Sequence, residues 1–264
     1  MSGQRLDGQR QDGQRLDGRV ALITGGGGAI GAATAIRLAR AGARLAIADI
    51  RREPAEQVVA TLRGEGFDAE AFVVNLAHEA EILAMVEAVM ARFGQIDILH
   101  NNAALGGKPF AADKTLLEMT AEVWDLTFAV NVRAPMLLAK AVLPQMIARG
   151  GGAIVNTSSG VTDITSTEAF TAYAPSKGAL QILTRYIAAQ GGPHNIRCNA
   201  VLPGVVLTEG MQAMFGDDQL KVMSDRFMLK RVCLPEDIAA MVHFLASDDA
   251  RQVTGELIRV TGGR

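Results

Sequence analysis

Tyr173 and Lys177 are the two residues whose types and spacing most directly suggest chemistry. They stand four positions apart, so on a helix both side chains lie on one face. The hydroxyl of a free tyrosine has a pKa of about 10, too high for a base at neutral pH. A lysine ammonium one turn away favours the phenolate, so we expect it to lower the pKa of Tyr173. The pair could then move a proton to or from a substrate hydroxyl, although taken alone it is more typical of an exposed helix pair.

A glycine-rich stretch at 25–31 could hold a phosphate group. It follows an apolar run at 19–24, typical of a buried strand, and precedes a helical pattern at 32–40. A second strand is predicted at 44–48, and Asp49 comes directly after it. Glycine lets the backbone approach a pyrophosphate closely, and the helix N-terminus supplies N–H groups and a positive partial charge. This order of strand, loop, helix, strand and acid predicts a dinucleotide site.

Asp49 indicates which dinucleotide would bind. A carboxylate at the tip of the second strand accepts hydrogen bonds from the ribose hydroxyls and repels a 2′-phosphate, which favours NAD. Arg51 and Arg52 are the opposing signal, since a guanidinium could bind the 2′-phosphate of NADP. Asp49 is closer to the expected ribose position, and the glycine loop contains no Arg or Lys. NAD is therefore the predicted cofactor, with NADP as the alternative.

Strands and helices are predicted to alternate along the rest of the chain. Such alternation implies an α/β fold: a single Rossmann-type domain with a doubly wound parallel sheet of about seven strands and helices on both faces. Pro135 lies inside the helix predicted at 118–146 and is expected to kink or break that helix. The further helices are expected at 54–63, 79–93, 118–146, 173–187 and 235–246, and the further strands at 70–74, 97–100, 153–155, 195–201 and 256–260.

Composition narrows the function classes. The chain has 264 residues, of which 49% are hydrophobic, and this is enough for one large core. Its formal net charge of −2 is too close to neutral to favour nucleic acid or a membrane surface as the partner. No apolar run is long enough to suggest a membrane span, and the polar start does not resemble a signal peptide. Cys198 and Cys233 form no C-x-x-C pair, and the four histidines lack metal-ligand spacing. We expect no metal and a cytoplasmic protein.

Residues 1–18 form a low-complexity segment in which Asp-Gly-Gln-Arg and Leu-Asp-Gly each occur twice. The segment has almost no apolar content, so a mobile tail is expected at 1–18 and a single domain at 19–264.

Six motifs, in this order, make the chain resemble the short-chain dehydrogenase/reductase family from Leu16 to Gly263. The family name rests on their order and spacing together, since each alone is weak. They are Thr24-Gly25-x-x-x-Ala29-x-Gly31, Asn101-Asn102-Ala103, Asn131, Ser159, Tyr173-x-x-x-Lys177 and Pro203-Gly204-x-x-x-Thr208.

The resemblance implies four catalytic residues. Tyr173 would be the general acid/base, and Lys177 would bind the nicotinamide ribose and lower the Tyr173 pKa. Ser159 would hydrogen-bond the substrate oxygen, and Asn131 would hold a water in a proton relay to Lys177.

The resemblance also implies the cofactor contacts. The glycine loop would hold the pyrophosphate and Asp49 the adenosine ribose, with Asn75 near the adenine and Asn101 beside a ribose. Val206 and Thr208 would contact the nicotinamide amide. The full predicted set is Gly25, Gly28, Ala29, Ile30, Gly31, Asp49, Ile50, Asn75, Leu76, Asn101, Ala103, Tyr173, Lys177, Pro203, Gly204, Val206 and Thr208.

The chain departs from the family pattern in four places. Asn75 and Thr261 stand where the family usually has Asp, and Ala104 where it usually has Gly. The separation from Ser159 to Tyr173 is one residue longer than the commonest spacing, which the following loop could absorb. Ser159 is preferred as the catalytic serine, with Ser158 as the alternative.

The predicted function is NAD-dependent interconversion of a secondary alcohol and a ketone. The Met- and Phe-rich segment Met211–Met228 suggests a pliable lid over an apolar or cyclic, steroid-like substrate, although core packing would also explain it. One alternative is an NADPH-dependent carbonyl or 3-oxoacyl reductase, and a second is a dinucleotide-binding protein without turnover. A homotetramer or dimer is implied by the resemblance, with 124–146 and 179–189 as candidate paired surfaces.

Overall fold

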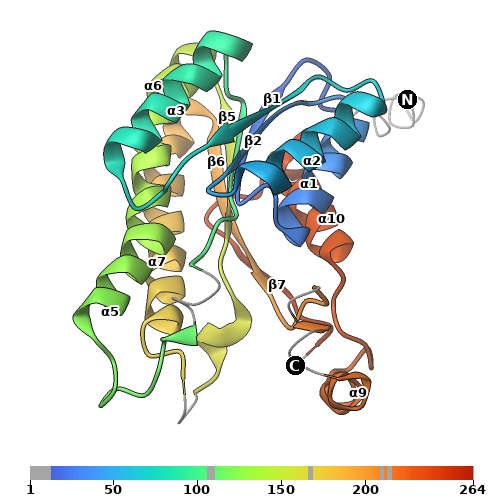
Figure 1. The fold of residues 1–264 in the computed structure, drawn as a ribbon. Coiled ribbons are helices and arrows are strands. Elements are labelled where there is room, and N and C mark those ends of the chain that lie inside the picture. Colours follow the sequence, from blue (N-terminus) through green and yellow to red (C-terminus); the bar gives the residue numbers. More distant parts are fainter. Residues whose placement is uncertain (1–12, 106–110, 166–168, 209–210, 213–215, 264) are drawn as a thin grey trace, which may run out of the picture.

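The computed structural model describes residues 13–105, 111–165, 169–208, 211–212 and 216–263 (Figure 1). Its centre is a seven-stranded sheet in the order β3-β2-β1-β4-β5-β6-β7, in which every pair of neighbours is parallel. The predicted doubly wound sheet is therefore confirmed. The strands are β1 (Val20–Thr24), β2 (Arg44–Asp49), β3 (Ala69–Val73), β4 (Ile98–Asn101), β5 (Gly152–Thr157), β6 (Ile196–Pro203) and β7 (Leu257–Val260).

Helices cover both faces of the sheet, with α3, α6 and α7 on one side and α1, α2 and α10 on the other (Figure 1). The α-helices are α1 (Ala29–Arg40), α2 (Arg52–Gly64), α3 (Glu79–Phe93), α5 (Ala121–Phe128), α6 (Ala134–Arg149), α7 (Tyr173–Gly191), α9 (Asp217–Ser224) and α10 (Pro235–Ala246). The bounds of α3 and α10 match the predicted ones, and most others differ by one to three residues.

Strand β1 shows why the pattern is apolar throughout. All five of its residues are buried. Val20 and Leu22 pack into the core on the α3 and α6 side, whereas Ala21 and Ile23 pack against α1 and α2. Alternate residues of a strand face opposite sides of the sheet, and a central parallel strand has no solvent-facing side. It therefore needs apolar residues at every position.

The helix predicted at 118–146 is divided as the proline suggested. A π-helical turn at Ala129–Arg133 separates α5 from α6, and Pro135 lies in the first turn of α6. Proline cannot donate the i→i−4 hydrogen bond, so the turn before it widens. The wide turn contains Asn131, which is fully buried.

The combined stretch Ala121–Arg149 is long and apolar enough by composition to cross a membrane, contrary to the sequence expectation. Half of its most apolar window is buried inside the protein. This burial is typical of the core helix of a folded domain.

The tail predicted at 1–18 extends too far along the chain, because residues 13–18 contact the folded domain. Leu16 is fully buried, its N–H donates to the Ala41 carbonyl, and its own carbonyl accepts from Arg19 N–H. The Gly13 carbonyl accepts from Asp248 N–H at 3.0 Å. The composition of 13–18 is polar, but one leucine placed in the core is enough to attach the segment. Residues 1–12 lie outside the described residues.

Leu16→Ala is expected to destabilise the protein by about 2–5 kcal/mol, because it removes a fully buried side chain and leaves a cavity. Urea unfolding followed by circular dichroism measures this. Leu6→Ala, in the first copy of the same Leu-Asp-Gly tripeptide, is the matched control and is expected from the sequence to leave the midpoint unchanged. Equal midpoints for Leu16→Ala and wild type would contradict the assignment of Leu16 to the core.

Candidate active site

The carboxyl edge of the sheet brings the predicted site residues together. The glycine loop follows β1, Asp49 ends β2 and Ile50 follows it, Asn75 and Leu76 follow β3, and Asn101 ends β4 with Ala103 just beyond. Ser159 lies just after β5, and Pro203 ends β6, with Gly204, Val206 and Thr208 following. The strand order changes direction between β1 and β4, which in open α/β sheets is where a ligand crevice forms.

The glycine loop is shaped for close approach. Gly25 has a φ of +62°, and a Cβ there would lie 2.9 Å from the Ala103 Cα. A Cβ at Gly31 would collide with the Gly25 carbonyl oxygen. Helix α1 starts at Ala29 with no side-chain cap and no acid in its first turn. Its N-terminal N–H groups are thus directed to the loop without a competing carboxylate of the helix, which fits a pyrophosphate.

Asp49 lies beside this loop. Its carboxylate is 6% exposed and accepts hydrogen bonds from the backbone N–H of Gly27 and of Arg51, each at 3.0 Å. The Arg51 guanidinium is 3.7 Å from the same carboxylate, and Arg52 pairs with Glu56 at 3.2 Å. Both arginines that could favour NADP therefore have acidic partners.

Helix α7 places Tyr173 in its first turn and Lys177 one turn later. The Ser159 hydroxyl hydrogen-bonds the Tyr173 side chain. The Lys177 ammonium donates to the Thr157 carbonyl at 2.8 Å and lies 5.5 Å from the centre of the Tyr173 ring. Three of the four side chains predicted to be catalytic therefore meet at the end of β5, although Tyr173 and Lys177 are 14 and 18 positions from Ser159 in sequence.

The acid–base state differs from the sequence expectation. Burial raises the pKa of Tyr173 to about 12, and the hydrogen bond from Ser159 only partly opposes this. Burial also lowers the pKa of Lys177 to about 7. The chain alone therefore lacks the lowered Tyr173 pKa that the sequence predicted, because desolvation disfavours the phenolate as well as the Lys177 ammonium. At neutral pH Tyr173 is a proton donor.

The lowered pKa of Lys177 predicts a pH dependence of stability. Between about pH 7 and the unfolded value of about 10.4, the unfolded chain binds a proton that the folded chain does not. Raising the pH through this window therefore favours the folded state. The rise in unfolding free energy from pH 7 to 9.5, measured in urea without cofactor, is expected to be smaller in Lys177→Met than in wild type. Exposed Lys140→Met is the control, and equal slopes in all three would contradict the shift.

The two candidate serines have different surroundings. The Ser158 hydroxyl is buried, donates to the Lys177 carbonyl at 3.1 Å and accepts from Gln181. It is thus used to fix helix α7 to β5. The Ser159 hydroxyl accepts from Val161 N–H at 3.1 Å and hydrogen-bonds the Tyr173 side chain, which is compatible with the predicted substrate-binding role. The geometry favours Ser159, as the motif did.

Asn131 joins three segments of the site. Its side chain donates to the Ser176 hydroxyl at 3.0 Å and accepts from Leu105 N–H at 2.9 Å. It thereby connects the π turn, helix α7 and the loop after β4. Its water-holding role stays a prediction.

The remaining predicted cofactor residues lie along the same edge. Asn75 Oδ1 accepts from Ala77 N–H at 3.0 Å, and Thr208 Oγ accepts from Met211 N–H at 3.2 Å. Val206 is buried beside Cys233. Asn101 donates to Asn156, and its own buried Oδ1 has no partner among the described residues. A buried acceptor without a donor at the carboxyl edge of the sheet could accept a hydrogen bond from a ligand hydroxyl.

A second group of polar residues was not predicted. His100 is fully buried, and its Nε2 lies 2.9 Å from the Thr157 hydroxyl, while the Thr157 carbonyl holds Lys177. Burial lowers the pKa of His100 to about 3, so this histidine is neutral. The available signal was the polar residues at the carboxyl ends of two strands that begin with apolar residues.

The Met- and Phe-rich segment does not behave as a single element. Within it, α9 covers only Asp217–Ser224, Phe227 is buried, and Met228 is 78% exposed. Met214 and Phe215 lie outside the described residues. Exposure of Met228 is unlike core packing, and the lid stays a prediction.

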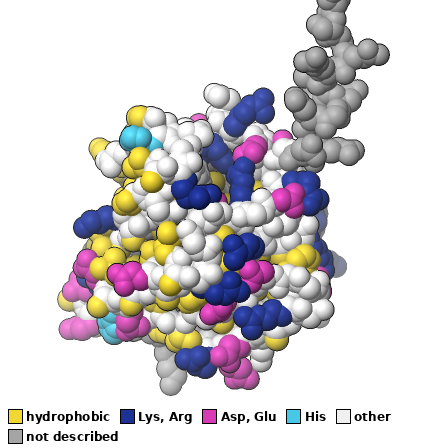
Figure 2. All heavy atoms as spheres, turned by 90° about the horizontal axis from the view of Figure 1, so that it is seen from above, with side chains coloured by type: hydrophobic (Ala, Val, Ile, Leu, Met, Phe, Trp, Pro, Cys, Tyr) yellow, Lys and Arg dark blue, Asp and Glu magenta, His cyan; other side chains and the backbone are white. Residues whose placement is uncertain are grey.

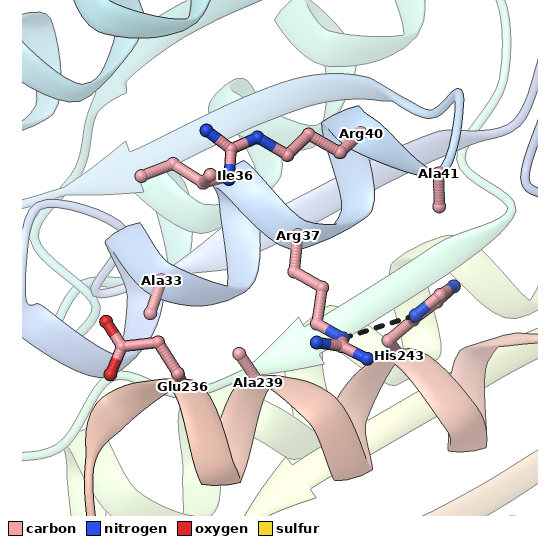
Figure 3. A pocket seen from close by; sticks show the side chains of 8 residues that line it. All are labelled: Ala33, Ile36, Arg37, Arg40, Ala41, Glu236, Ala239 and His243. Atoms are coloured by element: carbon pink, nitrogen blue, oxygen red, sulfur yellow. Dashed lines mark hydrogen bonds between the residues drawn. The ribbon is translucent and has the colours of Figure 1, made fainter.

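A hollow of about 470 Å³ lies elsewhere, between α1 and α10 (Figure 3). Arg37 donates to His243 Nδ1 at 3.3 Å, and His243 Nε2 lies 2.7 Å from the Gln14 carbonyl. Arg40 pairs with Glu65. None of the predicted site residues lines this hollow, and the described residues show no cluster of side chains suited to a metal ion.

Comparison with known proteins agrees with this geometry. The family model described as "Enoyl-(Acyl carrier protein) reductase" matches residues 27–264. The "Probable short-chain type dehydrogenase/reductase" of Bradyrhizobium diazoefficiens is 40% identical over 93% of this chain and 86% of that protein. The 7alpha-hydroxysteroid dehydrogenase of Bacteroides fragilis is 36% identical over 93% of each chain.

Two solved structures extend the comparison. A 7 alpha-hydroxysteroid dehydrogenase complexed with NADH and 7-oxo glycochenodeoxycholic acid has a TM-score of 0.89 and 33% identity, covering 96% of this chain and 97% of that one. An NAD+-bound xylitol dehydrogenase has a TM-score of 0.85 and 33% identity, covering 94% of this chain and 99% of that one.

Proposed function

This chain belongs to the short-chain dehydrogenase/reductase family, and we propose that it is an NAD-dependent enzyme interconverting a secondary alcohol and a ketone. The observation that carries the proposal is the meeting of Tyr173, Ser159 and Lys177 at the carboxyl edge of the sheet, the edge that also holds the glycine loop. A protein that only bound a dinucleotide would not need a half-buried tyrosine whose side chain is hydrogen-bonded to a serine.

The chain's residues have distinct roles in the proposed reaction. The bound nicotinamide supplies or accepts the hydride. Ser159 orients the substrate oxygen, and Tyr173 donates a proton to it or removes one from it. The Tyr173 pKa of about 12 suits the donor role, which is needed when a ketone is reduced. Lys177, held by the Thr157 carbonyl, positions the cofactor ribose.

An apolar or cyclic alcohol is the proposed substrate. The centre of the Phe170 ring lies 6.2 Å from the centre of the Tyr173 ring, which places an apolar side chain next to the tyrosine. Exposed Val222 and Met228 on the segment after β6 are available to cover such a molecule. The steroid dehydrogenase relatives support this class, whereas the xylitol dehydrogenase neighbour supports the alternative of a polyol. The family model's name, which mentions an acyl carrier protein, supports the further alternative of an acyl-thioester reductase.

We propose a cytoplasmic homo-oligomer, a tetramer or a dimer. Large apolar side chains are exposed on α5, α6 and α7, as expected of helices that pair with another copy: Trp124, Met136, Ile147, Ile182 and Tyr186. In Figure 2, basic and acidic side chains are interspersed on the face seen from above the view of Figure 1. This mixture supports small molecules, rather than nucleic acid, as the partners.

The test combines cofactor binding with turnover. Thermal shift with NAD, NADH, NADP and NADPH is followed by absorbance of the reduced nicotinamide over bulky cyclic alcohols, linear polyols and 3-oxoacyl thioesters. We expect a shift with NAD(H) and turnover of the cyclic class. A shift with NADP(H) alone would overturn the cofactor assignment, and binding with no turnover of any class would favour the non-catalytic alternative.

A further inference from the structure

Asp113 is a buried carboxylate that none of the motifs includes. It lies in the connection between β4 and α5, and is 5% exposed. One of its oxygens accepts from Ala172 N–H at 3.0 Å and the other from Tyr173 N–H at 2.7 Å. Both bonds join residues about 60 positions apart in the chain. All of the carboxylate's described partners are thus backbone groups at the start of helix α7.

Helix α7 lacks a cap of its own. The residue before it, Ala172, has no side chain that could accept a hydrogen bond, and the first turn contains no acid. The N-terminal N–H groups of a helix need acceptors and carry a positive partial charge. Asp113 supplies both an acceptor pair and a negative charge from a distant segment. It therefore caps α7 from outside.

A second contact fixes the same two segments. The Thr171 hydroxyl donates to the Lys114 carbonyl at 2.7 Å, next to the Asp113 bonds. Earlier in the connection, Leu105 N–H donates to the Asn131 side chain. The connection after β4 is thus bonded to the site at two places: Leu105 bonds Asn131, and residues 113–114 bond residues 171–173. Residues 106–110, between these two places, lie outside the described residues. Connections at this edge line the substrate pocket in open α/β sheets.

We propose that Asp113 is a positioning residue for the reaction proposed above: its carboxylate fixes the first turn of α7 and thereby holds the Tyr173 hydroxyl against Ser159. Asp113 bonds the backbone of Tyr173 itself, so loss of the cap displaces the proton donor directly. A displacement of about 1 Å costs about 10²-fold in rate when geometry is set for proton transfer. Cofactor binding at the glycine loop does not involve these contacts. The inference rests on the proposed function.

The test compares Asp113→Ala and Asp113→Asn with Glu118→Gln, which changes an exposed acid in the same connection. Asp113→Ala is expected to lower kcat about 10- to 100-fold, while the KM for NAD changes less than twofold. Asp113→Asn keeps one acceptor oxygen and is expected to retain more activity than Asp113→Ala. Glu118→Gln is expected to match wild type. Unchanged kcat in Asp113→Ala, or a fall matched by an equal loss of NAD binding, would overturn the positioning role.

Hydrogen exchange of the peptide containing Ala172 and Tyr173 adds a readout that needs no substrate. We expect this peptide to exchange at least tenfold faster in both Asp113 variants than in wild type. In Glu118→Gln we expect the wild-type exchange rate. Wild-type exchange rates in Asp113→Ala would overturn the proposal whether or not the enzyme is active. Faster exchange together with a wild type that turns over no substrate would instead refute the proposed function while retaining the cap.

Discussion

Tyr173→Phe is expected to lower kcat by about 10²- to 10⁴-fold with little change in NAD affinity. The substitution removes one hydroxyl oxygen and keeps the ring that lies under the Lys177 ammonium. Without the hydroxyl, the substrate oxygen has no proton donor that is also hydrogen-bonded to Ser159. Steady-state rates with the best substrate, and NAD affinity from thermal shift, separate the two effects.

The chain offers a matched control for this experiment. Its only other tyrosine, Tyr186, lies in the same helix and is 63% exposed. Tyr186→Phe makes the same chemical change away from the site, so its kcat is expected to stay within twofold of wild type. Full activity of Tyr173→Phe would refute the catalytic assignment. A large loss of kcat in Tyr186→Phe would show that the measured activity depends on assembly of the oligomer instead.

Asp49→Asn is expected to shift the ratio of kcat/KM for NAD over NADP by about 100-fold or more towards NADP. The amide keeps an oxygen for one of the two backbone N–H groups that the carboxylate binds, but it removes the charge that repels a 2′-phosphate. Losing the carboxylate also releases Arg51 from its 3.7 Å ion pair. The freed guanidinium is then available to the phosphate.

The double variant Asp49→Asn/Arg51→Ala tests that explanation. It is expected to lose most of the gain in NADP use while remaining poor with NAD, because the cation is gone and the ribose acceptor is not restored. Arg52→Ala is the control, since Arg52 is paired with Glu56. A wild-type enzyme that already prefers NADP would refute the assignment of Asp49.

Local patterns predicted most of the fold because the features involved are close in sequence. Helix α3 has the predicted bounds, since an amphipathic run ends at Gly94, which adopts a φ of +80°. The π turn before Pro135 follows from a missing backbone donor, which is also a local cause. Ser159 could be preferred over Ser158 from motif order, but the hydrogen bonds of Ser158 to Gln181 and to the Lys177 carbonyl appear only in the folded chain.

The sequence by itself determined the strand and helix order, the glycine loop, the acid at the end of β2, and the shared face of Tyr173 and Lys177. Each depends on residue type and short spacing. The tertiary structure decided the pKa of Tyr173, because desolvation sums over every segment packed around it. It also decided the burial of Leu16 and the cap from Asp113, since each depends on a contact between segments far apart in the chain.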